Sequence, residues 1–207
     1  FLPPEWAPQS ALWCGWPRLA DEWGGDFDGA RSDIAAFVRA AAAFVPVKLA
    51  AGSDEAAQSA QAAVGDVAQI VDVPTGDIWL RDTGPIITTG AGGKQAETFR
   101  FNGWGGKYLM PGAAAVAGIE GIRVRAHDIV LEGGAIDVDG EGRLLTTRQC
   151  LLNPNRNGDW TEADAEAALA KAFGINDVIW LGDGLLNDHT DGHVDNIARF
   201  IAPGHVL

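Results

Sequence analysis

Residues 187–200 read NDHTDGHVDNIARF and form the chemically densest stretch of the chain. The side chains in it that can act as acid, base or ligand are Asp188, His189, Asp191, His193 and Asp195. The apolar residues that follow predict a buried strand carrying a polar loop. Alternate side chains of an extended segment share a face, so we expect His193 and Asp195 in one pocket and Val194 on the opposite side. A solvated turn is the alternative, because Asn, Asp, Thr and Gly also build turns.

Two other apolar segments are interrupted in a similar way. Asp82 lies in residues 79–85, WLRDTGP, and Glu132 lies in residues 129–138, IVLEGGAIDV. Asp82, Glu132 and His193 each stand near a glycine at the mouth of an apolar strand, roughly 50 to 60 residues apart, which is close to the period of solenoid and propeller modules. The spacing indicates a repeated unit in which each module gives one polar residue to a common centre.

The intervening segments predict an alternation of helices and strands. Periodicity and capping residues predict helices at 32–44, 53–64 and 161–173, and the first is capped either by Ser32 or by the loop at 26–28. Apolar runs predict strands at 11–17, 47–50, 67–73, 86–89, 144–146 and 177–181. The glycine-rich residues 102–106, NGWGG, are expected to form a lid or a long turn.

Composition and charge narrow the classes of function. The chain has 207 residues and a net charge of -13, which disfavours nucleic acid and anionic membranes and favours a small cationic partner. No apolar run approaches the roughly 20 residues of a membrane span, and we expect a cytoplasmic protein. Cys14 and Cys150, the two cysteines, have no metal-knuckle spacing and are expected to be small buried residues.

Four motifs resemble those of the agmatine deiminase and bacterial peptidyl-arginine deiminase family, in the family's order. They are WLRDTGP at 79–85, LEGG at 131–134, TRQCLLNPNR at 147–156 and GHVD at 192–195. The resemblance implies an α/β fold of the guanidine-modifying (pentein) superfamily, a propeller of five ββαβ modules around a central site. About three modules would lie within residues 1–207, as a single catalytic domain truncated at its C-terminal end.

The resemblance also implies an activity, the hydrolysis of agmatine to N-carbamoylputrescine and ammonia through a covalent cysteine intermediate, without a metal or cofactor. Asp82 and Asp195 would hold the planar guanidinium, because carboxylates accept its paired N–H donors. His193 would act as general acid and then as general base, oriented by Glu132, which would raise its pKa. Trp79 would pack against the substrate.

The resemblance places the nucleophilic cysteine beyond residue 207, so residues 1–207 alone are expected to be inactive. Peptidyl or free arginine remains an alternative substrate, although residues 153–156, NPNR, favour agmatine. Two other classes stay open. A metal hydrolase would use His189, Asp191, His193 and Asp195 as ligands. A non-catalytic module would bind a small cation without turnover, and a homo-oligomer is left open.

Overall fold

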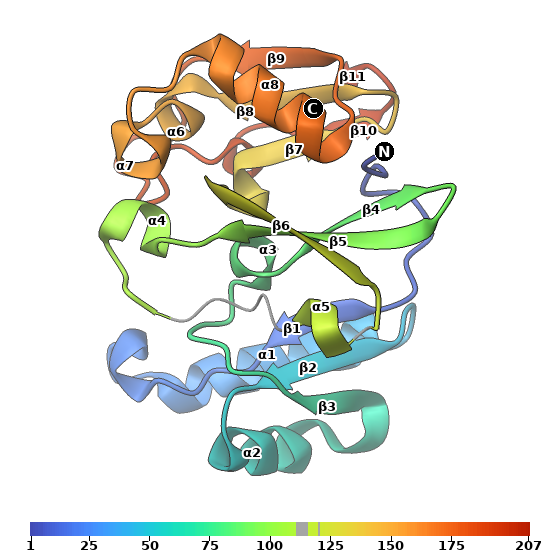
Figure 1. Cartoon of the computed structure of the whole chain (residues 1–207). Coiled ribbons are helices and arrows are strands. Elements are labelled where there is room, and N and C mark those ends of the chain that lie inside the picture. The colour runs from blue at the N-terminus through green and yellow to red at the C-terminus, as the bar shows by residue number, and fades with distance from the viewer. Residues whose placement is uncertain (111–115, 120) are drawn as a thin grey trace. The chain divides into compact units, whose positions relative to one another are not determined.

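The computed structural model describes residues 1–110, 116–119 and 121–207, which divide into two compact units (Figure 1). The first unit contains residues 1–7, 81–109 and 116–207, and the second is built on residues 8–80. Among the described residues, no helix combines the length and the apolar character needed to cross a membrane. The single catalytic domain expected over residues 1–207 stays a prediction.

The second unit is a three-stranded parallel sheet with two helices. The strands β1 (Leu12–Gly15), β2 (Val47–Ala51) and β3 (Ala68–Asp72) lie in that order, joined by α1 (Phe27–Ala41) and α2 (Asp54–Val64). Short 3-10 turns, η1 (Ala20–Trp23) and η2 (Gly65–Val67), precede α1 and follow α2. Because both crossovers join neighbouring parallel strands, α1 and α2 pack against each other and bury one face of the sheet.

The first unit contains two three-stranded sheets with the same topology. In one, β4 (Ile86–Gly90) is antiparallel to β5 (Gly93–Arg100), which is parallel to β6 (Arg123–Val130). In the other, β7 (Ile136–Val138) is antiparallel to β8 (Arg143–Thr147), which is parallel to β9 (Asp177–Leu181). Helices α4 (Gly103–Gly106) and α5 (Val116–Ile119) join β5 to β6, and α6 (Arg148–Leu151), α7 (Pro154–Asn157) and α8 (Glu162–Phe173) join β8 to β9. A hairpin of β10 (Phe200–Ala202) and β11 (His205–Val206) follows.

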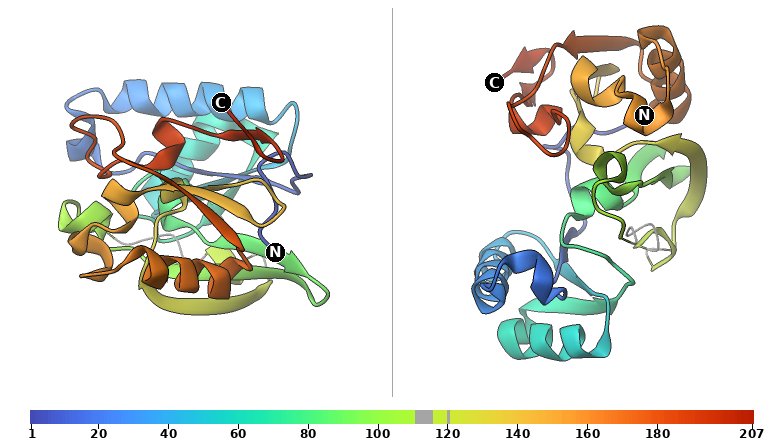
Figure 2. Two further views of the ribbon diagram at one scale, coloured as in Figure 1. Left: turned by 90° about the horizontal axis from the view of Figure 1, so that it is seen from above. Right: turned by 90° about the vertical axis from the view of Figure 1, so that its left-hand side faces the viewer.

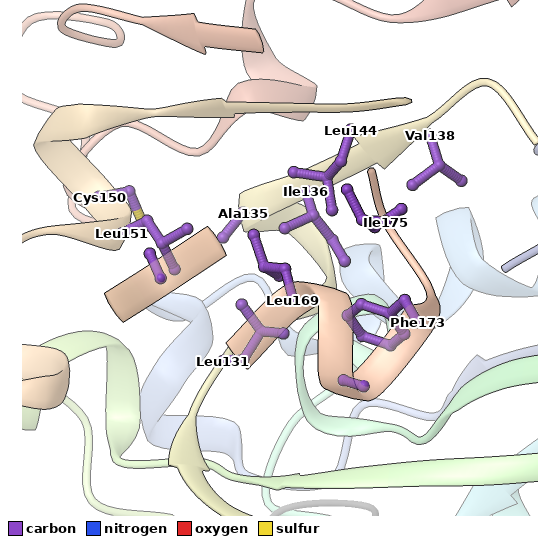
Figure 3. Close-up of a cluster of buried hydrophobic side chains, with 12 residues drawn as sticks. Leu131, Ala135, Ile136, Val138, Leu144, Cys150, Leu151, Leu169, Phe173 and Ile175 are labelled. Carbon is purple, nitrogen blue, oxygen red and sulfur yellow. The ribbon is translucent and has the colours of Figure 1, made fainter. Parts of the chain in front are cut away.

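Helix α8 covers the β7–β9 sheet (Figure 2). It begins at a capping box, in which Thr161 and Asp164 bond each other's backbone N–H groups, and ends at Gly174 in the left-handed conformation. Its apolar face packs on the sheet with Leu131, Ile136, Leu144, Leu169 and Phe173 in the core (Figure 3). Full burial of each such side chain contributes about 1.5 to 3 kcal/mol, so this core fixes residues 131–136 in place.

Helix α1 begins at Phe27, after the N-cap residue Asp26, which agrees with the cap expected in the loop at 26–28 and not with Ser32. The predicted end at Phe44 is wrong, because the helix ends at Ala41 and residues 42–45 bond back to Val38–Ala41 as turns. Residues 194–196 form the 3-10 turn η4 (Val194–Asn196) instead of an extended strand. Asp191 and Gly192, both at positive φ, redirect the chain just before this turn. The turn alternative thus describes the backbone, but the segment is not solvated, since His193 and Val194 are buried.

Candidate functional site

Three polar side chains from distant parts of the first unit converge on Gly134. A Cβ atom placed there would lie 2.5 Å from Nδ1 of His193, 2.7 Å from Oδ1 of Asp82 and 2.8 Å from Oδ2 of Asp195. The His193 Nδ1 and Asp82 Oδ1 atoms are 3.7 Å apart. Gly134 belongs to the turn η3 (Gly133–Ala135), and the space around it excludes any side chain. The predicted site residues Asp82, Asp195 and His193 therefore form one cluster.

Asp82 is held in the helical turn α3 (Leu80–Thr83) rather than at a strand mouth. Its Oδ1 atom accepts the Gly134 N–H and its Oδ2 atom accepts the Trp104 Nε1–H, both at 2.9 Å. Burial raises the pKa of Asp82, although the bonds from Trp104 and Gly134 oppose that shift. A carboxylate has about four acceptor positions, so two bonds orient Asp82 and leave it able to accept more.

Asp195 has fewer hydrogen-bond partners than Asp82. Burial raises its pKa, His193 lowers it, and the neighbouring charge of Asp82 raises it further. Within the described residues, no hydrogen bond reaches its carboxylate. Two carboxyl groups with raised pKa values therefore face the same point. A cation placed between them would lower the pKa of both groups.

His193 is 2 % exposed, and its Nε2 atom has no hydrogen-bond partner among the described residues. Burial lowers its pKa to about 4, with Arg156 adding to that shift and Asp195 opposing it. The net shift of the His193 pKa is therefore opposite to the expected rise, because burial outweighs the neighbouring carboxylates. The orienting role of Glu132 stays a prediction, and its Oε1 atom accepts the Nε–H of Arg156 at 2.8 Å. Burial raises the pKa of Glu132 as well, against the opposing effect of Arg156.

The loop that precedes His193 is pinned from two sides. From α7, Arg156 donates to the Asp191 carboxylate and, at 2.8 Å, to the Thr190 carbonyl. From the residue after α4, Lys107 Nζ donates at 2.6 Å both to Asp191 Oδ1 and to the His189 carbonyl. These bonds hold residues 189–191 in the conformation that delivers His193 to the cluster.

The predicted lid or turn at residues 102–106 is the short helical turn α4. Trp104 within it has φ 53° and ψ 51°, a left-handed backbone that is rare for a bulky residue, and it is 3 % exposed. Its ring meets Phe101, Tyr108 and His189 edge to face. Such backbone strain costs on the order of 1–3 kcal/mol and is typical of functional sites. The strained turn is what aims the indole N–H at Asp82.

The ligand set of the metal alternative is not assembled. Among the described residues, the one group of three or more candidate ligands with atoms within 4.8 Å of one another is Glu132, Cys150 and His193. The Asp191 carboxylate instead forms ion pairs with Arg156 and Lys107. The hypothesis that His189, Asp191, His193 and Asp195 share a metal is therefore wrong for this geometry.

Neither cysteine has the environment of a nucleophile. Burial raises the pKa of the Cys14 thiol to about 11. Burial, followed by the charge of Glu132, raises the pKa of the Cys150 thiol above its usual range. A nucleophilic cysteine needs a lowered pKa, so both thiols fit a structural role.

The sequence-based reasoning missed the roles of Gly134, Trp104, Lys107 and Arg156. The signal for two of them was present, because Gly134 and Arg156 lie inside the quoted motifs 131–134 and 147–156. Trp79 is 52 % exposed and belongs to the second unit, and its role stays a prediction.

The family model described as Porphyromonas-type peptidyl-arginine deiminase matches residues 1–207. Agmatine deiminase of Stutzerimonas stutzeri (strain A1501) is 41 % identical over 100 % of this chain. Agmatine deiminase of Ectopseudomonas mendocina (strain ymp) is 40 % identical over the same share. The chain spans 59 % of the length of each of these relatives.

Solved structures show the same α/β fold. The agmatine deiminase of Enterococcus faecalis has a TM-score of 0.93 at 32 % identity, over 99 % of this chain and 59 % of that one. The C315S agmatine deiminase of C. jejuni with substrate bound has a TM-score of 0.88 at 31 % identity, over 98 % of this chain and 62 % of that one.

Proposed function

The chain belongs to the Porphyromonas-type peptidyl-arginine deiminase family, and on that basis we propose that it carries the guanidinium-binding part of an agmatine deiminase. The observation that supports this most is the convergence of Asp82, Asp195 and His193 on Gly134. The carboxyl groups of Asp82 and Asp195 have raised pKa values because they are buried. A guanidinium ion offers a positive charge and paired N–H donors to this arrangement.

Agmatine is the proposed substrate, with peptidyl-arginine as the alternative. The relatives with about 40 % identity carry the name agmatine deiminase. The net charge of -13 favours a substrate that is cationic at both ends, because it attracts small cations. Free arginine and a C-terminal arginine carry a carboxylate, which this charge disfavours. Trp79 is proposed to pack against the methylene chain of the substrate.

His193 is proposed as the proton carrier of the reaction. With a pKa of about 4 it is neutral in the free site, so it first acts as a base and accepts the proton of the attacking thiol. The thiolate adds to the guanidinium carbon, His193 returns the proton to the departing nitrogen, and ammonia leaves. His193 then takes a proton from water, whose oxygen attacks the S-alkylthiouronium carbon. The C–S bond breaks, the sulfur takes back the proton held by His193, and the hydroxyl proton passes to solvent as the ureido product forms.

The thiol in this scheme is proposed to come from outside residues 1–207. The support is chemical, because the environments of Cys14 and Cys150 both disfavour the thiolate. The propeller of five ββαβ modules, with about three in this chain, is likewise a proposal. It is supported by the shared topology of the β4–β6 and β7–β9 sheets. A homo-oligomer stays a prediction.

The test is to supply agmatine to the gene product that contains residues 1–207 and to measure ammonia and N-carbamoylputrescine. We expect both products in equal amounts, and we expect His193→Ala to abolish them while agmatine still binds. Binding without either product would favour the non-catalytic cation-binding module. Citrulline formed from peptidyl-arginine, with agmatine left intact, would favour the alternative substrate.

A further inference from the structure

We infer that Arg156 is a positioning residue of this site, which holds Glu132 and His193 in place. The inference rests on the proposed function for its catalytic meaning, but its structural content concerns the free chain. Arg156 touches neither Asp82 nor Asp195 through any hydrogen bond in the described part of the chain. It therefore acts through other residues.

Each nitrogen atom of the Arg156 guanidinium donates at least one hydrogen bond. Its Nε donates to Oε1 of Glu132 at 2.8 Å, and its Nη2 donates to the Thr190 carbonyl at 2.8 Å. Its Nη1 donates to Oδ1 of Asn155 at 2.8 Å and to the carboxylate of Asp191. The side chain is 1 % exposed. A planar fork with five N–H donors can reach partners in these separate directions, and a lysine ammonium cannot.

Two routes lead from Arg156 to His193. The first passes through Thr190, whose carbonyl accepts from Arg156 and whose Oγ1 accepts the His193 backbone N–H at 3.1 Å. The second passes through Glu132, whose carboxylate lies within 4.8 Å of a ring nitrogen of His193. Backbone and ring of His193 are thus both placed relative to one buried cation.

Arg156 also affects the protonation equilibria of Glu132 and His193. The Glu132 side chain is 1 % exposed, and burial together with the nearby Asp82 favours its neutral form. Arg156 opposes both effects and favours the ionised carboxylate. The same positive charge favours the neutral imidazole of His193. Loss of this one charge would raise the pKa of both proposed catalytic groups.

The chain offers a matched control in Arg125. Its Nε and Nη2 atoms donate to the buried Glu97 at 2.7 and 3.0 Å, and Nη2 also bonds the Ala172 carbonyl near the end of α8. This second pair of an arginine and a buried glutamate ties β5 and β6 to α8 without contact with the Gly134 cluster. Arg125→Met therefore reports the structural cost of breaking such a pair.

The first experiment follows the His193 imidazole by NMR against pH in residues 1–207 without ligand, with the resonance assigned from His193→Gln. In Arg156→Met we expect its pKa to rise by at least about half a pH unit, because a nearby cation has been removed. In Arg125→Met we expect no change. A folded Arg156→Met with the wild-type His193 titration would overturn the inference.

Two more variants keep the test decisive if Arg156→Met does not fold. The double variant Glu132→Gln/Arg156→Met leaves no unpaired Glu132 charge. Compared with Glu132→Gln alone it lacks only the Arg156 cation, so we expect a higher His193 pKa than in Glu132→Gln, and equal values would overturn the inference. Arg156→Lys keeps the charge and loses the fork. We expect displaced amide resonances at residues 190–193 in that variant, and unchanged resonances there would contradict the positioning role.

Activity gives a separate readout in the gene product that contains these residues. Arg156→Lys is expected to lower kcat, by up to about 10²-fold for a misplacement of about 1 Å, with KM nearly unchanged, because Asp82 and Asp195 still hold the substrate. A rise in KM with unchanged kcat would contradict the inference. If wild-type protein shows no turnover while the NMR shifts occur, the proposed function fails and the placement of His193 by Arg156 stands.

Discussion

Trp104 donates its indole N–H to Oδ2 of Asp82 across 2.9 Å, between two buried groups. The bond lowers the pKa of Asp82 against the effect of burial, so it helps keep a cation-binding carboxylate ionised and fixed in direction. The left-handed backbone at Trp104 is the local strain that accompanies this contact.

Trp104→Phe should therefore weaken agmatine binding while most of the ring packing remains. A hydrogen bond to a charged group contributes about 1.5 to 3 kcal/mol, which corresponds to roughly a tenfold to hundredfold loss of affinity. Calorimetric titration measures this. Trp180→Phe is the control, since the Trp180 indole donates to Glu166 at the surface. Equal affinity in both variants would show that the Asp82 contact is not needed.

Gly134→Ala should disrupt the cluster. The added methyl group would lie under 3.0 Å from polar atoms of His193, Asp82 and Asp195, so these side chains must separate. We expect agmatine affinity to be lost and the melting temperature to fall. Gly182→Ala is the matched control, because a Cβ there meets nothing within 4 Å and its φ is not positive. Unchanged binding in Gly134→Ala would refute the geometry of the site.

Asp195→Asn should stabilise the free protein near neutral pH while it weakens cation binding. The folded-state pKa of Asp195 is raised, so its contribution to stability is fully present below the unfolded pKa of about 3.9 and is lost as pH rises through the folded value. The amide of the Asn side chain stays neutral, so the variant does not lose this stability as the pH rises. Denaturant unfolding at several pH values tests this, and the gap between variant and wild type should close as pH falls towards 4. A variant less stable than wild type at pH 7 would contradict the prediction.

The imidazole of His193 should make stability fall in acid. Its folded pKa is lowered from 6.5 to about 4, so the stabilisation is present above pH 6.5 and is lost as pH falls through that range. The shift corresponds to a contribution on the order of 3 kcal/mol. His193→Gln cannot be protonated and should lose this part of the pH dependence. Parallel stability curves for variant and wild type between pH 4 and 7 would exclude the lowered pKa.

Local signals in the sequence predicted local structure well. Ser53 caps α2, and Thr161, Asp164 and Gly174 bound α8, because capping depends on a few neighbouring residues. The strand at 177–181 is confirmed for the same reason, since a short apolar run between a helix end and a glycine is a local pattern. In contrast, the extended segment expected through His193 and Asp195 is wrong, because Asp191 and Gly192 adopt positive φ, which periodicity does not reveal.

The residues of the site could be predicted from the sequence, but the contacts between them could not. Motifs named Asp82, Asp195 and His193, and the structure brings these together. The direction of the His193 shift could not be predicted, because it depends on burial and on Arg156 lying between Glu132 and the 189–191 loop. The role of Trp104 could not be predicted either, because its hydrogen bond to Asp82 depends on its own left-handed backbone conformation.

Agmatine binding to residues 1–207 tests the central claim most directly. Calorimetry should compare agmatine with putrescine, which has no guanidinium, in wild type and in Asp82→Asn/Asp195→Asn. We predict that agmatine binds the wild type, and more tightly at pH 8 than at pH 5, because the carboxyl groups with raised pKa values must be ionised. Putrescine should bind more weakly, and the double variant should bind neither. Equal binding of the two amines, or agmatine binding that survives in the double variant, would contradict the account.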